Sequence, residues 1–167
     1  VWASCMVACG DADGAVTGNT RRFGASLEKI KLVVNPRIGE IMFGLNLVVH
    51  KGKTIFVADT SVHEYPSSEQ MSEIAISAAR VVRLFGFDPK VAFVSHSTFG
   101  QPVTNRTKHI RKAVDILKEK NVDFEFDGDM QPDVALNKEY KNLYPFSNIV
   151  GNANILIMPG QHSAAIS

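Results

Sequence analysis

Hydroxyl, carboxylate and amide side chains are concentrated in short segments that follow predicted strands. Residues 95–100, Ser-His-Ser-Thr-Phe-Gly, offer three hydroxyls and a glycine, and residues 127–131, Asp-Gly-Asp-Met-Gln, offer two carboxylates and an amide. The segments 59–61 and 159–163 have a similar polar character. A crevice lined by hydroxyls, backbone N–H groups and a few carboxylates suits a phosphate-bearing or acyl ligand.

Each polar segment also has a purely structural interpretation. Ser and Thr after a strand commonly cap the next helix, and Asp127-Gly128 is typical of a turn. A nucleophilic triad can be composed from Ser97, Asp127 and either His96 or His162, although no G-x-S-x-G elbow surrounds the serine. These alternatives stay open at this stage, and no catalytic residue is assigned.

Metal and nucleotide motifs are missing from the sequence. The five histidines lack metal-ligand spacing, so we expect no metal site. Gly10, Gly14 and Gly18 are four residues apart, which matches neither a P-loop nor a G-x-G-x-x-G fingerprint. The basic residues of the predicted helix 107–120 alternate with an apolar stripe, and we expect them to form a solvated face. They are Lys108, Arg111, Lys112, Lys118 and Lys120.

The elements that must position the polar segments alternate between strands and helices. Strands are predicted over residues 41–49, 54–58, 90–94, 124–126 and 154–158, and helices over the N-terminal apolar run and residues 26–34, 67–85, 107–120 and 132–142. The first two strands predict an antiparallel hairpin, and Ser67 with Gln70 predicts a capping box. The pattern therefore predicts an α/β fold with a mixed, mostly parallel sheet and helices on both of its faces. Ligands bind such sheets at the carboxyl ends of the parallel strands.

Length and composition restrict the function further. The chain has 167 residues, 45% of them hydrophobic, and a net charge of +1, which indicates one globular domain and no nucleic-acid partner. The longest apolar stretch, residues 41–49, is far shorter than the roughly 20 residues of a membrane span, so no membrane partner is expected. Cys5 and Cys9 are four residues apart on a predicted helix, which favours buried thiols and a cytoplasmic location. The apolar ends of the chain indicate a piece truncated at both ends.

The same segments resemble motifs of the phosphate acetyl/butyryl transferase family. Their order agrees with that family, and together they cover nearly the whole chain. Residues 11–18 resemble its A-D-G-x-V-S/T-G segment, 58–75 its A-D-x-x-V…P-x-x-x-Q-x-x-x-I-A stretch, 94–100 its L-S-Y-S-T-x-G loop, 126–135 its D-G-E-[LM]-Q-x-D-A-A pattern and 153–156 its A-N-V-L segment.

Within the family, the amino-acid sequence is most similar to the C-terminal domain of bacterial NADP-dependent malic enzymes. This similarity is clearest in residues 59–66, 123–128, 144–146 and 158–167. The resemblance implies an N-terminal catalytic part, absent from this chain, that uses NADP and a divalent metal to decarboxylate malate oxidatively to pyruvate. It also implies that the transferase-like domain binds acetyl-CoA as an effector and holds a homo-oligomer together.

The resemblance implies a three-layer α/β/α sandwich, akin to isocitrate and isopropylmalate dehydrogenases, and a set of ligand-binding residues. An active phosphate acetyltransferase is the alternative, in which the loop hydroxyls hold phosphate while CoA thiolate attacks the acyl carbon. The family's S-R-G…D element lies outside this chain, and Glu28 stands where a basic residue is usual. The expected ligand-binding residues are Thr17, Asp59, Ser95, Ser97, Thr98, Gly100, Asp127 and Gln131.

Overall fold

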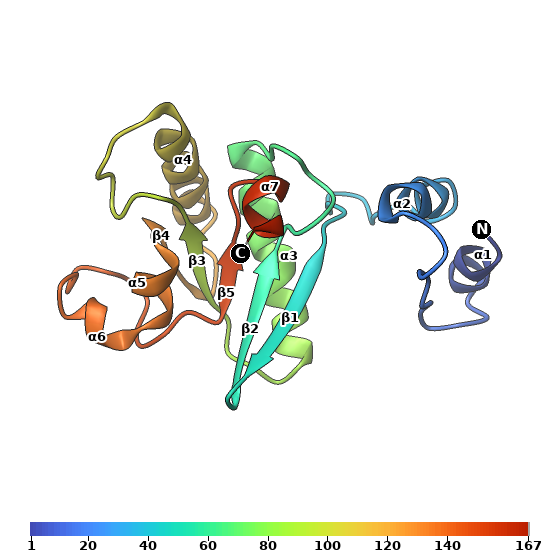
Figure 1. Cartoon of the computed structure of the whole chain (residues 1–167), viewed down its shortest axis with the longest axis horizontal. Helices are drawn as coiled ribbons and strands as arrows, with labels where there is room; N and C mark the ends of the chain where they lie inside the picture. Colours follow the sequence, from blue (N-terminus) through green and yellow to red (C-terminus); the bar gives the residue numbers. More distant parts are fainter. Residues whose placement is uncertain (167) are drawn as a thin grey trace. The chain divides into compact units, whose positions relative to one another are not determined.

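The computed structural model describes residues 1–166, apart from the side chain of Lys141, and it divides into two compact units (Figure 1). Unit 1 is Val1–Glu40, and unit 2 begins at Ile41. In the described residues, no helix combines the length and the apolar content that a membrane crossing requires.

Unit 1 consists of two helices and the loop between them. Helix α1 is Trp2–Cys9, and it ends at Gly10, whose N–H caps the helix in a left-handed conformation. Helix α2 is Phe23–Lys31, three residues earlier than the predicted 26–34, because the chain leaves the helix in a turn at Leu32 before Pro36. Ser4 is the one buried residue of α1, and α2 has none, so unit 1 has little core of its own.

Unit 2 is built around a five-stranded sheet with the order β1-β2-β5-β3-β4. Strands β1 and β2 form the expected antiparallel hairpin, and the other strand pairs are parallel. The sequence prediction of a mixed, mostly parallel sheet is therefore confirmed. The strands are β1 Leu45–His50, β2 Lys53–Ala58, β3 Lys90–Val94, β4 Glu125–Met130 and β5 Ile155–Ile157.

Helices cover both faces of this sheet, as the α/β/α prediction requires (Figure 1). Helices α3, Ser68–Leu84, and α4, Asn105–Glu119, pack on one face, where they meet Val91 and Phe93 of β3. Ala92 and Val94 face the opposite layer, because side chains alternate along a strand. That layer contains α5, Pro132–Leu136, and α7, Gln161–Ala165, while the short α6, Lys138–Lys141, follows α5.

Several element boundaries differ from the prediction. Strand β1 begins at Leu45 rather than residue 41, because the Gly44 N–H is taken by the Asp59 carboxylate. The predicted helix 132–142 is split in two, because the Asn137 side chain starts α6 by accepting from the Glu139 N–H. Strand β4 extends from Glu125 to Met130, so residues 127–130 belong to a strand and not to a loop.

The helix caps show whether the hydroxyl residues that follow β3 cap the next helix. Ser67 and Gln70 form the expected capping box at α3. Helix α4 is capped by Thr104 and Thr107, also in a capping box, so the hydroxyls of residues 95–98 do not cap it.

Candidate functional site

The loop 95–100 follows β3 and contacts the carboxyl end of the neighbouring strand β4. The Ser95 N–H donates to the Met130 carbonyl at 2.9 Å, and the Gln131 Nε2 donates to the His96 carbonyl at 2.9 Å. The Gln131 N–H donates to Thr98 Oγ1 at 3.3 Å. The structure thus brings Ser95, Thr98 and Gln131 together in one region.

A hydrogen-bonded chain of buried side chains connects this loop to α4. Ser97 and Asp129 are both 0% exposed, and the Ser97 hydroxyl donates to Asp129 Oδ2. Ser95 Oγ lies 3.1 Å from Ser97 Oγ, and Arg111 Nε lies 3.1 Å from Asp129 Oδ1. Gly100 leaves room for the guanidinium, because a Cβ at Gly100 would lie 2.6 Å from Arg111 Nη1 and its φ is +85°.

A β-bulge directs Asp129 toward the serines. Ala92 pairs with Asp127 and Phe93 with Gly128, but Val94 pairs with Met130, so Asp129 is an extra residue in β4. Only glycine fits at position 128, because a Cβ there would lie 2.7 Å from Phe93 Cβ. A bulge commonly turns a side chain away from the regular alternation.

Asp127 serves a different contact from the one predicted for it. Its carboxylate accepts from the Asn148 N–H at 2.7 Å and from the Gly128 N–H at 2.9 Å, and it lines a cavity of about 490 Å³ beside α4. The carboxylate that meets Ser97 is that of Asp129, so Ser97 and Asp127 do not form the triad considered above.

A second cavity lies at the carboxyl ends of β3 and β5, where the parallel-sheet rule places a ligand. Its volume is about 210 Å³, and Ser95 is the member of the 95-to-97 serine pair that lines it. Arg106 also lines it, with its guanidinium carbon 5.6 Å from the centre of the Tyr65 ring. The complete lining is Val94, Ser95, His96, Arg106, Pro132, Met158, Pro159, Ser163 and Ile166.

Asp59 organises the loop that follows β2. Its buried carboxylate accepts from the N–H groups of Gly44, Ser61, Val62 and His63 at 2.7 to 3.1 Å, and the His63 Nδ1 lies 2.6 Å away. Burial raises the pKa of this carboxyl, but the hydrogen bonds from Ser61, Gly44, His63 and Val62 together outweigh burial and leave the pKa below its usual value.

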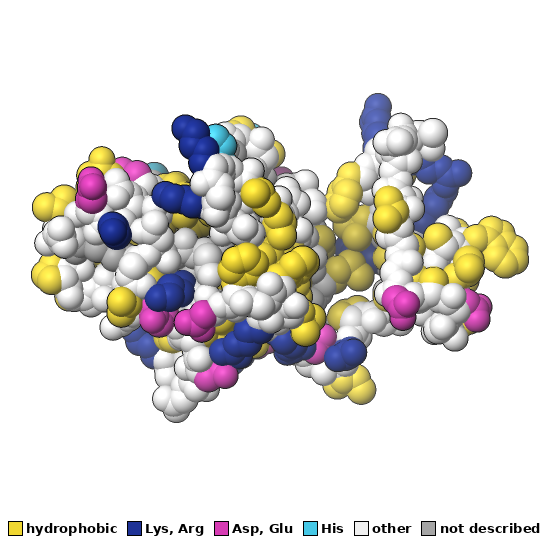
Figure 2. Space-filling view, turned by 90° about the horizontal axis from the view of Figure 1, so that it is seen from below, with side chains coloured by type: hydrophobic (Ala, Val, Ile, Leu, Met, Phe, Trp, Pro, Cys, Tyr) yellow, Lys and Arg dark blue, Asp and Glu magenta, His cyan; other side chains and the backbone are white. Residues whose placement is uncertain are grey.

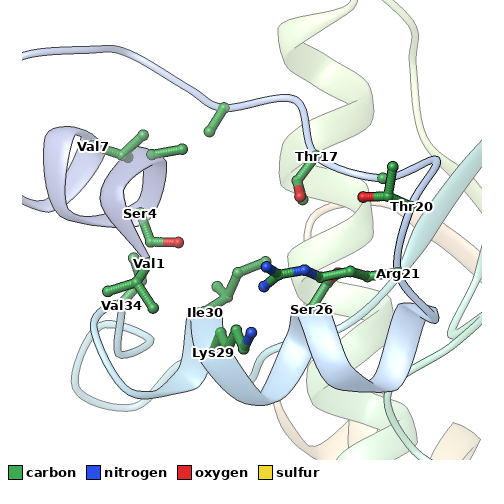
Figure 3. Close-up of a pocket in the computed structure, with 13 residues that line it drawn as sticks. Val1, Ser4, Val7, Thr17, Thr20, Arg21, Ser26, Lys29, Ile30 and Val34 are labelled. Atoms are coloured by element: carbon green, nitrogen blue, oxygen red, sulfur yellow. The ribbon is translucent and has the colours of Figure 1, made fainter.

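Thr17 lies in unit 1, in a pocket of about 470 Å³ formed by residues of that unit (Figure 3). In the close-up, Thr17 and Thr20 are on the loop, and the Arg21 side chain extends along α2 past Ser26. Lys29 also lines the pocket, so a cation is available there although the neighbouring Glu28 is acidic.

Two residues of the site, Asp129 and Arg111, were missed by the sequence interpretation. Arg111 lies on the solvated face as expected, with 46% of its side chain exposed, but its guanidinium also reaches the fully buried Asp129, a contact that the sequence did not predict. The three-residue spacing from Arg111 to Val114 puts it beside the buried stripe, a signal that could have distinguished it. The other helix cations are surface residues as expected, and Lys112, Lys118 and Lys120 pair with Glu69, Asp115 and Glu73.

The described residues contain no group of three or more His, Cys, Asp or Glu side chains placed to hold a metal ion. In the face shown in Figure 2, basic and acidic side chains are interspersed over the surface. The polar residues that line the cavity at the ends of β3 and β5 are Ser95, His96, Arg106 and Ser163.

A family model described as phosphate acetyl/butaryl transferase matches residues 1–167. The chain belongs to this family. An NADP-dependent malic enzyme of Rhizobium meliloti (strain 1021) is 45% identical over 166 residues, which are 99% of this chain and 22% of that protein. A phosphate acetyltransferase of Buchnera aphidicola subsp. Schizaphis graminum (strain Sg) is 28% identical over 169 residues, and the match covers 100% of this chain and 24% of that protein.

Solved structures of this transferase family share the fold. A phosphotransacetylase from Streptococcus pyogenes superposes with a TM-score of 0.89 at 27% identity, covering 99% of this chain and 51% of its own. The EutD phosphotransacetylase from Staphylococcus aureus gives a TM-score of 0.84. The chain therefore corresponds to about half of these phosphotransacetylases and to 22% of the first malic enzyme.

Proposed function

We propose that this phosphate acetyltransferase-like domain is the C-terminal part of a bacterial NADP-dependent malic enzyme, where it binds acetyl-CoA as a regulatory and assembly module. The observation that carries the proposal is the gradient of identity. Malic enzymes of Rhizobium meliloti and Rickettsia prowazekii are 45% and 41% identical, whereas two phosphate acetyltransferases are 28% and 30% identical.

The hydrogen bonding of the loop supports a binding role over phosphate transfer. The Ser97 hydroxyl is committed to Asp129, and the N–H groups of Thr98 and Phe99 donate to the carbonyls of Gln101 and Asp129. A phosphate oxygen needs free donors, and these donors are already used. Active acetyl transfer between CoA and phosphate is the second candidate, favoured by the phosphate acetyltransferase relatives.

A transfer assay separates the two candidates. Residues 1–167, mixed with acetyl phosphate and CoA, are expected to show no turnover above the uncatalysed background, because the family's S-R-G…D element is not among them. General acid–base assistance alone is worth about 10² to 10⁴ in rate. Turnover that Ser97→Ala abolishes would establish the second candidate.

The regulatory role is tested on the full-length protein. Its malate decarboxylation rate, with NADP and the divalent metal supplied, should change as acetyl-CoA is added, and the change should disappear in a protein that lacks residues 41–167. A rate independent of acetyl-CoA at every malate concentration would contradict the proposed regulation.

The assembly role and the location are proposed from surface features. Leu47, Val48 and Val49 of β1 are all more than 40% exposed, and apolar side chains are visible on the surface in Figure 2. Clustered apolar surface commonly marks an interface. Sedimentation of the full-length protein should therefore show a dimer or larger, and a monomer across concentrations would contradict this role. The expected burial of both thiols was wrong, because Cys9 is exposed and Cys5 is half-buried. We place the domain in the cytoplasm, since both cysteines are free thiols.

A further inference from the structure

We propose that Ser95 presents a hydrogen-bond acceptor to the 210 Å³ cavity, so that this cavity takes an uncharged N–H group of a ligand and not a phosphate. Such a group is the amide N–H of an acyl-pantetheine chain. The choice of acyl-CoA as the natural ligand rests on the proposed function, whereas the direction of the hydrogen bond rests on the buried side chains alone.

The direction is set at Asp129. Arg111 carries a permanently protonated guanidinium, which donates to Asp129 Oδ1 at 3.1 Å. Asp129 is the acidic partner of this ion pair, and a carboxylate only accepts hydrogen bonds. The hydrogen between Asp129 Oδ2 and the Ser97 hydroxyl must therefore come from Ser97.

The direction then passes to Ser95. A hydroxyl has one hydrogen and two lone pairs, and Ser97 has given its hydrogen to Asp129. In the 3.1 Å contact between the two serine oxygens, Ser95 must consequently be the donor. Ser95 Oγ also accepts from the Ser97 N–H at 3.3 Å, which leaves one lone pair unused, and Ser95 is among the residues that line the cavity.

The rest of the cavity agrees with an uncharged occupant. Most of its lining is apolar, with Val94, Pro132, Met158, Pro159 and Ile166 as the apolar members. Its arginine, Arg106, is exposed and stacks over Tyr65, so a charged part of the ligand is better accommodated at the surface.

One substitution should reverse the direction. In Asp129→Asn, Arg111 still requires an acceptor, which holds the amide oxygen toward the guanidinium and turns the amide NH₂ toward Ser97. Ser97 would then accept from the amide and donate to Ser95, and the Ser95 hydrogen would point into the cavity. The cavity of this variant should prefer a ligand acceptor.

The test uses ligand-observed NMR titration of the full-length protein with two small thioesters. S-Acetyl-N-acetylcysteamine carries an amide N–H, and its N-methyl derivative does not. We expect the unsubstituted protein to bind the N–H compound roughly two to ten times more tightly, the size of one net hydrogen bond. Ser95→Ala should bring this ratio close to one, and any preference that remains in this variant measures the effect of the added methyl group alone. Asp129→Asn should bring the ratio to one or below.

Asp123→Asn is the matched control, because Asp123 is an exposed carboxylate that pairs with Arg83 and not with the serines, and it should keep the ratio. Ser97→Ala supplies a second break in the chain if Asp129→Asn does not fold, and it should lower the ratio without reversing it. Thermal melting identifies folded variants.

Each outcome of the titration supports or contradicts the proposed acceptor role of Ser95. Equal binding of the two thioesters by the unsubstituted protein, or inorganic phosphate that competes in a Ser95-dependent way, would overturn the inference even if acetyl-CoA binds. An N–H preference that depends on Ser95 would support it even if acetyl-CoA itself fails to bind, and in that case only the proposed function would fail.

Discussion

Two buried carboxylates of unit 2, Asp59 and Asp129, occupy comparable places and have different consequences. Both lie at or near the carboxyl end of a strand and are 0 to 1% exposed. Asp59 accepts hydrogen bonds from four backbone N–H groups and lies against the His63 ring. Three of these N–H groups and the ring belong to the residues that follow Asp59, and the fourth N–H is that of Gly44, which precedes β1. Asp129 has two side-chain partners from separate elements, Arg111 and Ser97.

The difference shows how burial alone fails to identify a functional carboxylate. The hydrogen bonds of Asp59 end on four backbone N–H groups and on the His63 ring of the same loop, so this residue fixes the shape of that loop and holds it against Gly44. The hydrogen bonds of Asp129 continue through Ser97 to Ser95, which lines a cavity. Substitutions at the two sites should therefore affect stability and binding in different proportions.

The largest effect on stability is expected for Asp59→Ala. The substitution leaves several N–H groups of a partly buried loop without an acceptor, and each costs about 1 to 3 kcal/mol if water does not replace it. With partial replacement by water, we expect a loss of about 3 to 5 kcal/mol in the free energy of unfolding. Urea denaturation measures this loss, and Asp11→Ala, at an exposed position, is the control. A loss below about 1 kcal/mol would contradict the assigned role.

Arg111→Gln should have a smaller effect on stability. It leaves Asp129 buried without its cation, but Arg111 is 46% exposed and water can approach the vacated position. We expect a loss of about 1 to 3 kcal/mol, measured by the same denaturation, with weaker binding of the N–H thioester. If binding changes while stability does not, the ion pair acts on the site without supporting the fold.

The pH dependence of stability should also distinguish Asp59. Its pKa in the folded chain lies below the usual 3.8, so this carboxyl contributes stability above about pH 4 and loses it as the pH falls through the folded pKa. The stability difference between the unsubstituted chain and Asp59→Asn should therefore shrink between pH 5 and pH 3, measured by denaturation in that range. A difference that is constant over this range would contradict the lowered pKa.

The smallest effect is expected at the helix surface. The Lys112 side chain donates to Glu69 at 2.7 Å, and this hydrogen bond, with smaller help from the Glu69 backbone and the Ser67 side chain, lowers the pKa of the Glu69 carboxyl to about 2. Both side chains of the pair are nevertheless at least 60% exposed. Solvent screens such pairs, so Glu69→Gln should leave the urea midpoint nearly unchanged at neutral pH. A clear shift of the midpoint would show that α3 and α4 depend on this pair.

Much of this arrangement could be predicted from the sequence, because local patterns determine it. The alternation of strands and helices predicted the sheet, and Ser67 with Gln70 predicted the start of α3. The role of Asp129 could not be predicted, since it depends on a bulge that breaks the regular pairing of β3 with β4. A period-two reading of β4 gives Asp127 and Asp129 the same direction, and the structure gives them different partners.

The most direct test of the proposed function is the equilibrium binding of acetyl-CoA to the full-length protein, measured by titration calorimetry with and without Ser95→Ala. One net hydrogen bond contributes about 0.5 to 1.5 kcal/mol. We predict saturable binding at one site per chain, weakened roughly two- to tenfold by Ser95→Ala and unchanged by Asp123→Asn, at an exposed carboxylate that pairs with Arg83. No binding of acetyl-CoA, or binding of equal strength in the Ser95→Ala protein, would contradict the assignment of this cavity as its site.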